Sequence, residues 1–280
     1  MKFFLFGLIL YGFSTEATIL PPNNLLLYDT GKGEGLSLES FHETISRFEV
    51  AYKPVIEKAG NRLVINRLWE NPLVNAGTLK NGKDIIINLY GGYARHPFVT
   101  PDGYALVICH ELGHHLGGFP KKKFQDGKVG WPSTEGQADY FATLKCLRNI
   151  FKDEEFNVPE ESIPKEVLSK CRESFTNLKE RLICIRSSLA GMTVAKISTD
   201  IRRYEIPLAF ETPDTSIVPQ TFEPHPLPQC RLDTYFQGSL CLISHRIPFS
   251  TEDETKGSCH RKTGYQTGMR PLCWFKPSIE

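Results

Sequence analysis

Hydrophobic residues between positions 37 and 60 recur at the three- and four-residue spacing of an amphipathic helix. Four of them define the apolar face of this helix: Phe41, Ile45, Phe48 and Tyr52. Pro54 is expected to kink or end the helix, and Gly60 to stop any continuation. The pattern therefore predicts one buried helical face early in the chain.

The following stretches alternate hydrophobic and polar residues, which is the pattern of strands. Residues 62–70 alternate in this way, and residues 74–79 and 83–92 flank Asn81-Gly82. Asn-Gly is a pair typical of tight hairpin turns. We therefore expect a small sheet after the first helix.

Helical spacing then returns. Thr100 can cap a helix that begins at Pro101 and ends at Gly117-Gly118. Three further helical stretches are expected: 134–151, with Ser133 as its cap, about 165–175 and about 177–203. A small sheet followed by a run of helices predicts the α+β class.

The two ends of the chain differ from this middle part. Met1-Lys2 and the apolar run 3–13, with small residues before Ala17, are typical of a signal peptide, and the run is short for a membrane span. A retained N-terminal anchor is the alternative. After about residue 204 prolines and turn residues dominate. The predicted organisation is a signal peptide (1–17), a main domain (18–203) and a cysteine-rich C-terminal segment (204–280).

Charge excludes some classes of partner. The 280 residues include 33 Lys and Arg against 32 Asp and Glu, so neither a nucleic-acid footprint nor a basic membrane patch is visible. The run "KKK" at 121–123 is interpreted as a solvated turn. Beyond the N-terminal run no stretch approaches a membrane span, so we expect no stable span in the mature chain.

Eight cysteines behind a predicted signal peptide favour disulfides and an oxidising compartment. The candidate pairs are Cys230 with Cys241, Cys259 with Cys273, and Cys146 with Cys171 or Cys184. Cys109 is interpreted as a buried free thiol or a disulfide partner, and not as a metal ligand.

The stretch "HELGH", residues 110–114, is the candidate metal-binding motif of the chain. Residues four apart lie on one face of a helix, so His110 and His114 can bind one metal ion. Glu111 lies beside them and can take a proton from water. A catalytic zinc ion needs a third protein ligand. The metzincin pattern would have a histidine at position 120, which is Pro120.

The next predicted helix offers the missing ligand in "EGQAD", residues 135–139. Glu135 and Asp139 are four apart and share a face. Glu135 is the expected third ligand, and Asp139 can accept the second N–H of a ligand imidazole. The alternative is an acidic helix start that interacts only with the helix dipole. Its place directly after the histidine motif favours a site for one zinc ion per chain.

The order "HELGHH" and then "EGQAD" resembles the gluzincin zinc metallopeptidases, in particular the CAAX prenyl endopeptidases and HtpX-type bacterial envelope proteases. The likeness covers roughly residues 60–235. It implies an edge strand at Asn75-Ala76 that pairs with an extended substrate. It also implies that His225 and Arg231, in "PHPLPQCR", line the cleft and stabilise the developing oxyanion. The chain departs from that family in a shorter spacing between the second histidine and the glutamate, and in lacking membrane helices.

Together these features predict an exported zinc metalloendopeptidase with a zincin-like fold and a peptide or protein substrate. The resemblance implies a bacterial protein that is periplasmic or secreted. Two alternatives remain: a cell-wall peptide amidase, and a zinc-binding envelope-assembly or binding protein with weak or no proteolysis. Glu111 favours an enzyme, because metal binding alone does not require it.

Overall fold

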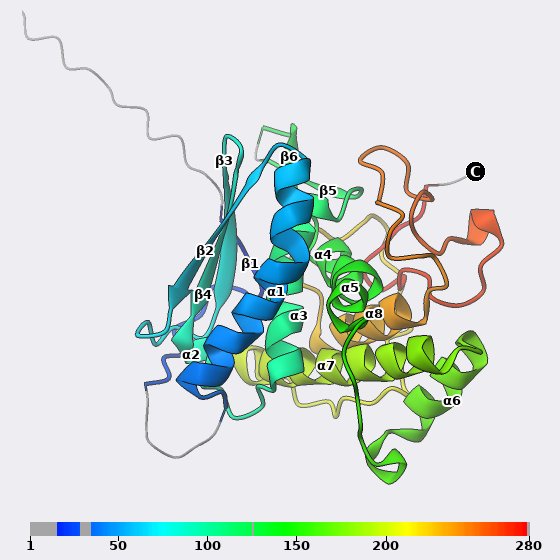
Figure 1. Cartoon of the computed structure of the whole chain (residues 1–280). Coiled ribbons are helices and arrows are strands. Elements are labelled where there is room, and N and C mark those ends of the chain that lie inside the picture. Colours follow the sequence, from blue (N-terminus) through cyan, green and yellow to red (C-terminus); the bar gives the residue numbers. More distant parts are fainter. Residues whose placement is uncertain (1–15, 29–34, 125, 279–280) are drawn as a thin grey trace, which may run out of the picture.

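The structure, a computed structural model, describes residues 16–28, 35–124 and 126–278 (Figure 1). A twisted sheet forms one side of the molecule, and most of the helices lie on the other side. The predicted α+β class is therefore confirmed. The predicted signal peptide falls almost entirely outside the described residues.

The sheet has four strands in the order β1-β3-β4-β2, with β2 parallel to β4 and the other neighbours antiparallel. Their bounds are Ala17–Thr18 for β1, Arg62–Leu68 for β2, Ala76–Asn81 for β3 and Asp84–Tyr90 for β4. The predicted hairpin forms, but because Asn81 pairs with Asp84 its turn is Gly82-Lys83, one residue later than the expected Asn81-Gly82. Gly82 has a φ of +57°, which explains why glycine is suited to this turn.

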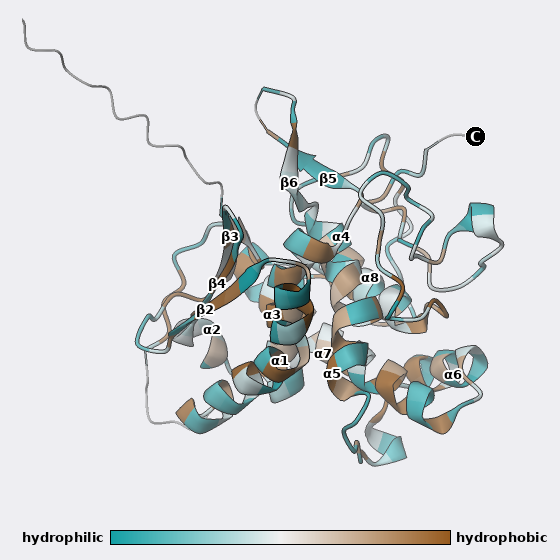
Figure 2. Cartoon of the chain, turned by 45° about the horizontal axis from the view of Figure 1, so that its top comes forward, coloured by the Kyte–Doolittle hydropathy of each residue, from teal (hydrophilic) through white to brown (hydrophobic). Residues whose placement is uncertain are grey.

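Helix α1 (Leu38–Lys58) packs the predicted apolar face against the sheet and α3. Ser37 caps it by accepting a hydrogen bond from the Ser40 amide. Pro54 lies inside α1 and does not end it. Figure 2 shows hydrophobic and hydrophilic residues alternating around α1, as expected for a helix with one buried side.

Helix α3 (Pro101–Leu116) is the central element, because it contacts the sheet, α1, α4 and α7. Thr100 caps it and Pro101 is its first residue, as predicted. The short helix α2 (Gly91–Ala94) precedes it, and the small sheet of β5 (Lys121–Lys123) and β6 (Val129–Ser133) follows it. Burial of nearly the whole of α3 places the histidine motif inside the molecule.

The second helix of the site is α4 (Glu135–Phe141), which continues through a π-helical turn (Ala142–Leu147) into α5 (Arg148–Phe151). The expectation that Ser133 caps it is wrong. Thr134 is the N-cap residue and makes no side-chain capping bond. Ser133 instead donates its hydroxyl to the Gly118 carbonyl, which ties β6 to the end of α3.

The two later predicted helices are confirmed as α6 (Lys165–Ser174) and α7 (Leu178–Arg202). Residues 204–280 are more regular than expected, because they contain the buried helix α8 (Pro228–Leu240). Gln229, Arg231 and Asp233 are buried polar residues of α8. They interrupt the three- and four-residue spacing of hydrophobic residues from which a buried helix is predicted, so the sequence did not indicate α8. Two 3-10 turns, Glu160–Ser162 and Arg261–Thr263, complete the regular elements.

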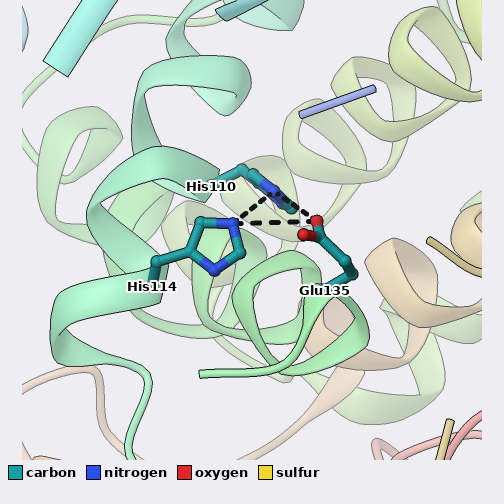
Figure 3. Close-up of side chains that lie close together, drawn as sticks. All are labelled: His110, His114 and Glu135. Atoms are coloured by element: carbon teal, nitrogen blue, oxygen red, sulfur yellow. Dashed lines mark hydrogen bonds and ion pairs between the residues drawn. The ribbon is translucent and has the colours of Figure 1, made fainter. Parts of the chain in front are cut away.

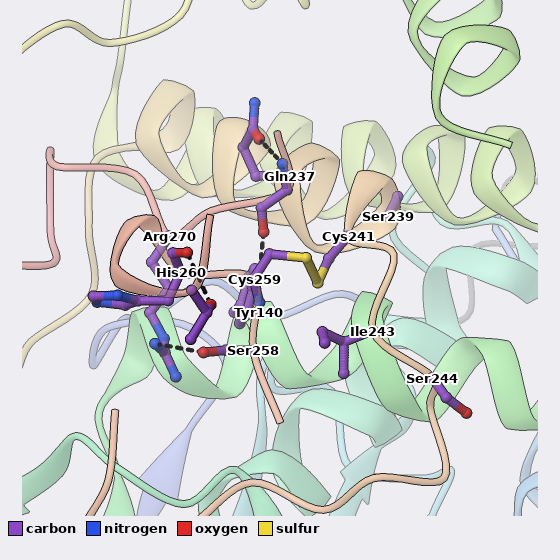
Figure 4. The surroundings of a disulfide bond; sticks show 12 residues. Tyr140, Gln237, Ser239, Cys241, Ile243, Ser244, Ser258, Cys259, His260 and Arg270 are labelled. Atoms are coloured by element: carbon purple, nitrogen blue, oxygen red, sulfur yellow. Dashed lines mark hydrogen bonds between the residues drawn. A yellow bond between two sulfur atoms is a disulfide. The ribbon is translucent and has the colours of Figure 1, made fainter. Parts of the chain in front are cut away.

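All eight cysteines form disulfides, but the predicted pairs are wrong. The observed pairs are Cys109–Cys146, Cys171–Cys184, Cys230–Cys273 and Cys241–Cys259. Cys109 is thus a disulfide partner, one of the two roles expected for it. Figure 4 shows Cys241–Cys259 beside Tyr140 of α4, where Arg270 also donates to the Ser258 hydroxyl at 3.3 Å. The two disulfides within 204–280 tie the start of α8 to Cys273 and the residue after its end to Cys259, and α8 packs against α4.

Helices in the described part of the chain are all too short or too polar to cross a membrane. The disulfides agree with folding in an oxidising compartment, which is consistent with an exported protein.

Candidate metal centre

Helix α3 brings His110 and His114 together in the interior. Both imidazoles are fully buried, and their ring centroids lie 4.8 Å apart. The two Nε2 atoms are 3.1 Å from each other. The i, i+4 spacing of the sequence motif therefore produces the predicted convergence of two nitrogen ligands.

Glu135, the first residue of α4, completes the cluster (Figure 3). Its Oε2 atom lies 3.2 Å from His110 Nε2 and 3.7 Å from His114 Nε2. A Cβ added at Gly113 would stand 2.8 Å from the Ala138 carbonyl oxygen, closer than real Cβ contacts come. Glycine at this position is what lets α4 approach α3 and deliver Glu135.

The outer nitrogens of the two imidazoles are held by acceptors. His110 Nδ1 lies 2.6 Å from Asp139 Oδ1, and His114 Nδ1 lies 2.9 Å from the Ser133 carbonyl oxygen. Since a carboxylate and a carbonyl only accept, both Nδ1 atoms carry the hydrogen. In their neutral forms the Nε2 atoms therefore direct lone pairs at one another, an arrangement that a cation between them stabilises.

The donor set fits a metal ion. The ligand atoms of His110, His114 and Glu135 all lie within 4.8 Å of one another, and all three residues are buried. Glu135 Oε2 has no hydrogen-bond partner among the described residues. Two imidazoles and one carboxylate leave a fourth tetrahedral position open, the ligand count of catalytic zinc sites. The structure thus shows a group that could hold a metal ion, and the chemistry of the donors suits zinc.

The charges around the cluster keep Glu135 ionised and favour a positive charge beside it. Burial alone would raise the pKa of Glu135, but His225, Lys122 and His114 hold it well below its usual range. Burial disfavours a charged His110, yet Asp139 and Glu135 outweigh burial and raise the pKa of His110 to about 9. The carboxylates thus make this cluster a favourable place for one positive charge.

Glu111 lies next to His110 on α3 and is fully buried. Neither of its carboxylate oxygens has a hydrogen-bond partner among the described residues. Burial, against the lowering effect of the His110 charge and with the help of the Glu135 and Glu16 carboxylates, raises the pKa of Glu111 to about 8. A buried carboxyl group without a partner is costly to a fold, so its presence beside the cluster points to a chemical role.

His225 and Arg231 come from the loop before α8 and from α8 itself. His225 Nε2 lies 3.3 Å from Glu135 Oε2 and 2.7 Å from the Thr18 carbonyl oxygen. Arg231 is buried and donates to both carboxylate oxygens of Asp139, at 2.8 and 2.7 Å. The structure therefore brings both predicted residues to the cluster, where Arg231 holds Asp139 and His225 lies beside Glu135.

The expected edge strand is occupied. Asn75 and Ala76 stand at the start of β3, but β3 is internal because β1 pairs with it. The amide of Ile19 donates to the Ala76 carbonyl at 3.2 Å. The amide of Leu20 donates to Asn75 Oδ1, also at 3.2 Å. The prediction of a free edge at Asn75 and Ala76 is therefore wrong, because residues 17–20 of the same chain already bind there.

Two residues that contact the centre, Lys122 and Tyr235, were not identified from the sequence. Lys122 was interpreted as part of a solvated turn, yet its Nζ lies 2.5 Å from Glu135 Oε1. Tyr235 of α8 donates its hydroxyl to Asp139 Oδ1 at 2.6 Å. Tyr235 follows Arg231 by four residues, so helical spacing alone could have placed both on one face. Nothing local marks Lys122, whose role depends on how β5 lies against α4.

No family model, no curated protein and no solved structure matches this chain. The centre is therefore described by its own geometry: two imidazoles and a carboxylate around one point, with an unpartnered glutamate beside them.

Proposed function

We propose that the protein is a zinc-dependent metalloendopeptidase. The observation that carries this proposal is Glu111, a buried carboxylate without a hydrogen-bond partner next to the three converging ligands. A site that only stores or binds a metal ion has no use for such a group. The resemblance of the two motifs to gluzincins supports the same activity.

His110, His114 and Glu135 would hold the zinc ion, which supplies the Lewis acidity that polarises a carbonyl group and makes water a stronger acid. Glu111 takes the proton from the attacking water and passes it to the leaving amine. His225 donates its Nε2 hydrogen to the carbonyl oxygen as negative charge develops there. Burial of the cluster strengthens each of these electrostatic interactions.

The polar backbone groups at the start of β3 supply the substrate-binding surface. Asn75 and Ala76 present an amide side chain and a carbonyl oxygen that satisfy an extended backbone. Backbone pairing of this kind recognises a peptide with little dependence on its sequence. A peptide substrate therefore suits this site. Export to the periplasm or outside the cell is part of the proposal, and the four disulfides support it.

The test is cleavage of a peptide library by purified protein loaded with zinc, read by mass spectrometry. We expect cleavage that a chelator abolishes and zinc restores. Glu111→Gln should keep one zinc ion per chain and lose roughly 10²–10⁴-fold in kcat, because the amide cannot accept the proton. The matched control is Glu161→Gln, at an exposed position far from the cluster, which should behave as wild type.

Cleavage of the library at the normal rate by zinc-loaded Glu111→Gln would contradict this role of Glu111. Absence of cleavage by the zinc-loaded wild-type protein would contradict the proposed activity.

A further inference from the structure

The chain passes through its own candidate site. Residues 16–20 pass beside β3, where the two-residue strand β1 pairs antiparallel with it, Ala17 opposite Thr78 and Thr18 opposite Gly77. This segment lies between β3 on one side and the His225–Arg231 element on the other, because groups from both contact it. It therefore occupies the position that the proposed function gives to a peptide substrate.

The backbone carbonyl of Thr18 and both backbone groups of Ile19 each form a hydrogen bond with the surrounding protein. His225 Nε2 donates to the Thr18 carbonyl at 2.7 Å, and the Ile19 amide donates to the Ala76 carbonyl at 3.2 Å. Arg231 Nη1 donates to the Ile19 carbonyl at 2.6 Å. These contacts bracket one peptide bond, Thr18–Ile19, with the proposed oxyanion donor on its carbonyl oxygen.

The residue that follows is held as firmly. Asn75 accepts a hydrogen bond from the Leu20 amide and donates one to the Leu20 carbonyl, both at 3.2 Å. The side chains of Ile19 and Leu20 are completely buried, whereas Glu16 is exposed. Binding is thus strongest on the C-terminal side of the Thr18–Ile19 bond, where two apolar side chains are enclosed.

We propose that, in a chain whose first 18 residues are still attached, the first substrate of this enzyme is its own Thr18–Ile19 bond. This inference rests on the proposed function, including its zinc ion. Water adds a hydroxyl group to the Thr18 carbonyl carbon, the C–N bond breaks, and the Ile19 nitrogen takes up a proton. Glu111 carries that proton. The products are a carboxylate at Thr18 and an amine at Ile19, and nothing is oxidised or reduced.

Cleavage changes the two sides of the bond differently. Ile19 and Leu20 stay attached to the fold through their buried side chains and the contacts to Arg231 and Asn75. Residues 16–18 keep two register positions on β3 and the contacts to His225 and Asn88, fewer than hold Ile19 and Leu20, so we expect them to dissociate. Departure of residues 1–18 frees the edge of β3 at Gly77 and Thr78 for another peptide.

The experiment starts from the full chain, made without an export system under disulfide-forming conditions and kept in chelator. Zinc is then added, and the N-terminus is followed by mass spectrometry at several protein concentrations. Wild type and the exposed control Glu161→Gln should acquire Ile19 as first residue at a rate independent of concentration. Glu111→Gln, whose carboxylate has no partner to lose, should be slower by roughly 10²–10⁴-fold.

Three outcomes overturn the inference. One is an intact Thr18–Ile19 bond in a protein that cuts the peptide library, which refutes self-cleavage and leaves the proposed function standing. Another is cleavage at a different bond or at a rate that rises with concentration. The third is a wild-type protein that cuts neither the library nor itself, which refutes both proposals together.

A second measurement does not depend on catalysis. In metal-free Glu111→Gln the amides of Ile19 and Leu20 should exchange slowly with solvent, because Ala76 and Asn75 accept their hydrogen bonds. Asn75→Ala should speed exchange at Leu20 and, in the otherwise wild-type chain, slow self-cleavage by about tenfold or more through loss of alignment. Asn61→Ala, in the turn before β2, is the matched control and should change neither. Rapid exchange at Ile19 and Leu20 in the parent protein would overturn the proposed binding mode.

Discussion

Asp139 is the residue on which the most polar contacts of the centre converge. Its two oxygens accept hydrogen bonds from His110, Arg231 and Tyr235 at distances between 2.6 and 2.8 Å. Burial would raise the pKa of Asp139, but the Arg231 and His110 charges lower it far below its usual range. The carboxylate therefore stays ionised in the core and fixes the tautomer of His110.

Asp139→Asn should weaken zinc binding or activity by roughly 10–100-fold, the usual effect of changing a group that orients a metal-ligating histidine. An amide has no charge to balance Arg231 and cannot accept from every donor. Zinc affinity measured by competition with a chelator checks this. Tyr235→Phe, which removes one donor and keeps the carboxylate, should have a smaller effect. Equal zinc affinity in Asp139→Asn and wild type would contradict the orienting role.

The helix pair α3 and α4 was the part of the fold most readily predicted from the sequence. Two local rules were sufficient to place His110, Glu111 and His114 on one helix with the two histidines on the same face: the i, i+4 spacing and the capping of α3 by Thr100. Glu135 also followed, because it lies on the next helix. The contact between these helices needs Gly113, whose role becomes evident only once Ala138 is seen beside it.

Other elements could not be predicted because their meaning lies in distant contacts. Helix α8 was missed because its buried polar residues mask the helical period. The pairing of Cys230 with Cys273 passes over the nearer Cys241, since the helix between Cys230 and Cys241 holds these two residues apart. Strand β1 has two residues, too few for any periodicity to appear.

The disulfide Cys109–Cys146 joins α3 to the π-helical turn after α4, directly behind the centre. Replacing both residues with alanine should destabilise the protein by about 3–4 kcal/mol, since the bond closes a loop spanning 37 positions. Denaturant unfolding of the metal-free protein measures this. The matched control, alanine at Cys171 and Cys184, opens a loop of 13 and should cost about 1 kcal/mol less. An equal or larger loss in the control would contradict the expected order.

At the scale of the whole molecule, three distant segments meet around Arg231. Its guanidinium contacts Asp139 of α4 and the Ile19 carbonyl of the N-terminal segment, and α8 carries it within the disulfide-braced C-terminal segment. Residues 204–280 are therefore part of the centre and not an appendage to it. The sequence division at residue 203 reflects a change in residue pattern, whereas the site needs all three segments.

The pH dependence of global stability should depend on Lys145, a buried amine of the π-helical turn Ala142–Leu147 that contacts the C-terminal segment. Burial first, and then the Arg148 and Arg270 charges, lower the pKa of Lys145 to about 7. Its Nζ donates to the Ser244 carbonyl at 3.0 Å. Between about pH 7 and 10.5 the unfolded chain holds a proton that the folded chain lacks, so the free energy of unfolding rises with pH. Below about pH 7 both states are protonated and the cost of the buried charge is fully present.

Lys145→Met should remove this contribution, which amounts to a slope of up to about 1.4 kcal/mol per pH unit within that window. Denaturant unfolding at a series of pH values compares the variant with wild type and with Lys165→Met, at an exposed position on α6. Parallel curves for Lys145→Met and wild type between pH 7 and 10.5 would contradict a neutralised Lys145 in the folded protein.

Metal binding links the centre to the stability of the whole chain. His110 and His114 belong to α3, and Glu135 belongs to α4, so the three ligands converge only when the two helices are packed. An ion that binds only the folded state adds about 2.7 kcal/mol of stability when its free concentration is 100 times the Kd. For a chain of this size that corresponds to a rise in Tm of roughly 5–10 °C.

We therefore expect zinc to raise the Tm of wild type and of Glu111→Gln alike, because Glu111 does not bind the ion. The double variant His110→Ala/His114→Ala should unfold at one temperature with and without zinc, and elemental analysis should find no stoichiometric metal in it. Calorimetric scans with zinc and with chelator measure all three proteins. A zinc-dependent rise in Tm that survived in the double variant would place the ion elsewhere and remove the basis for the proposed hydrolysis. A rise confined to proteins with both histidines would instead tie the energy of the metal site to the packing of α3 against α4.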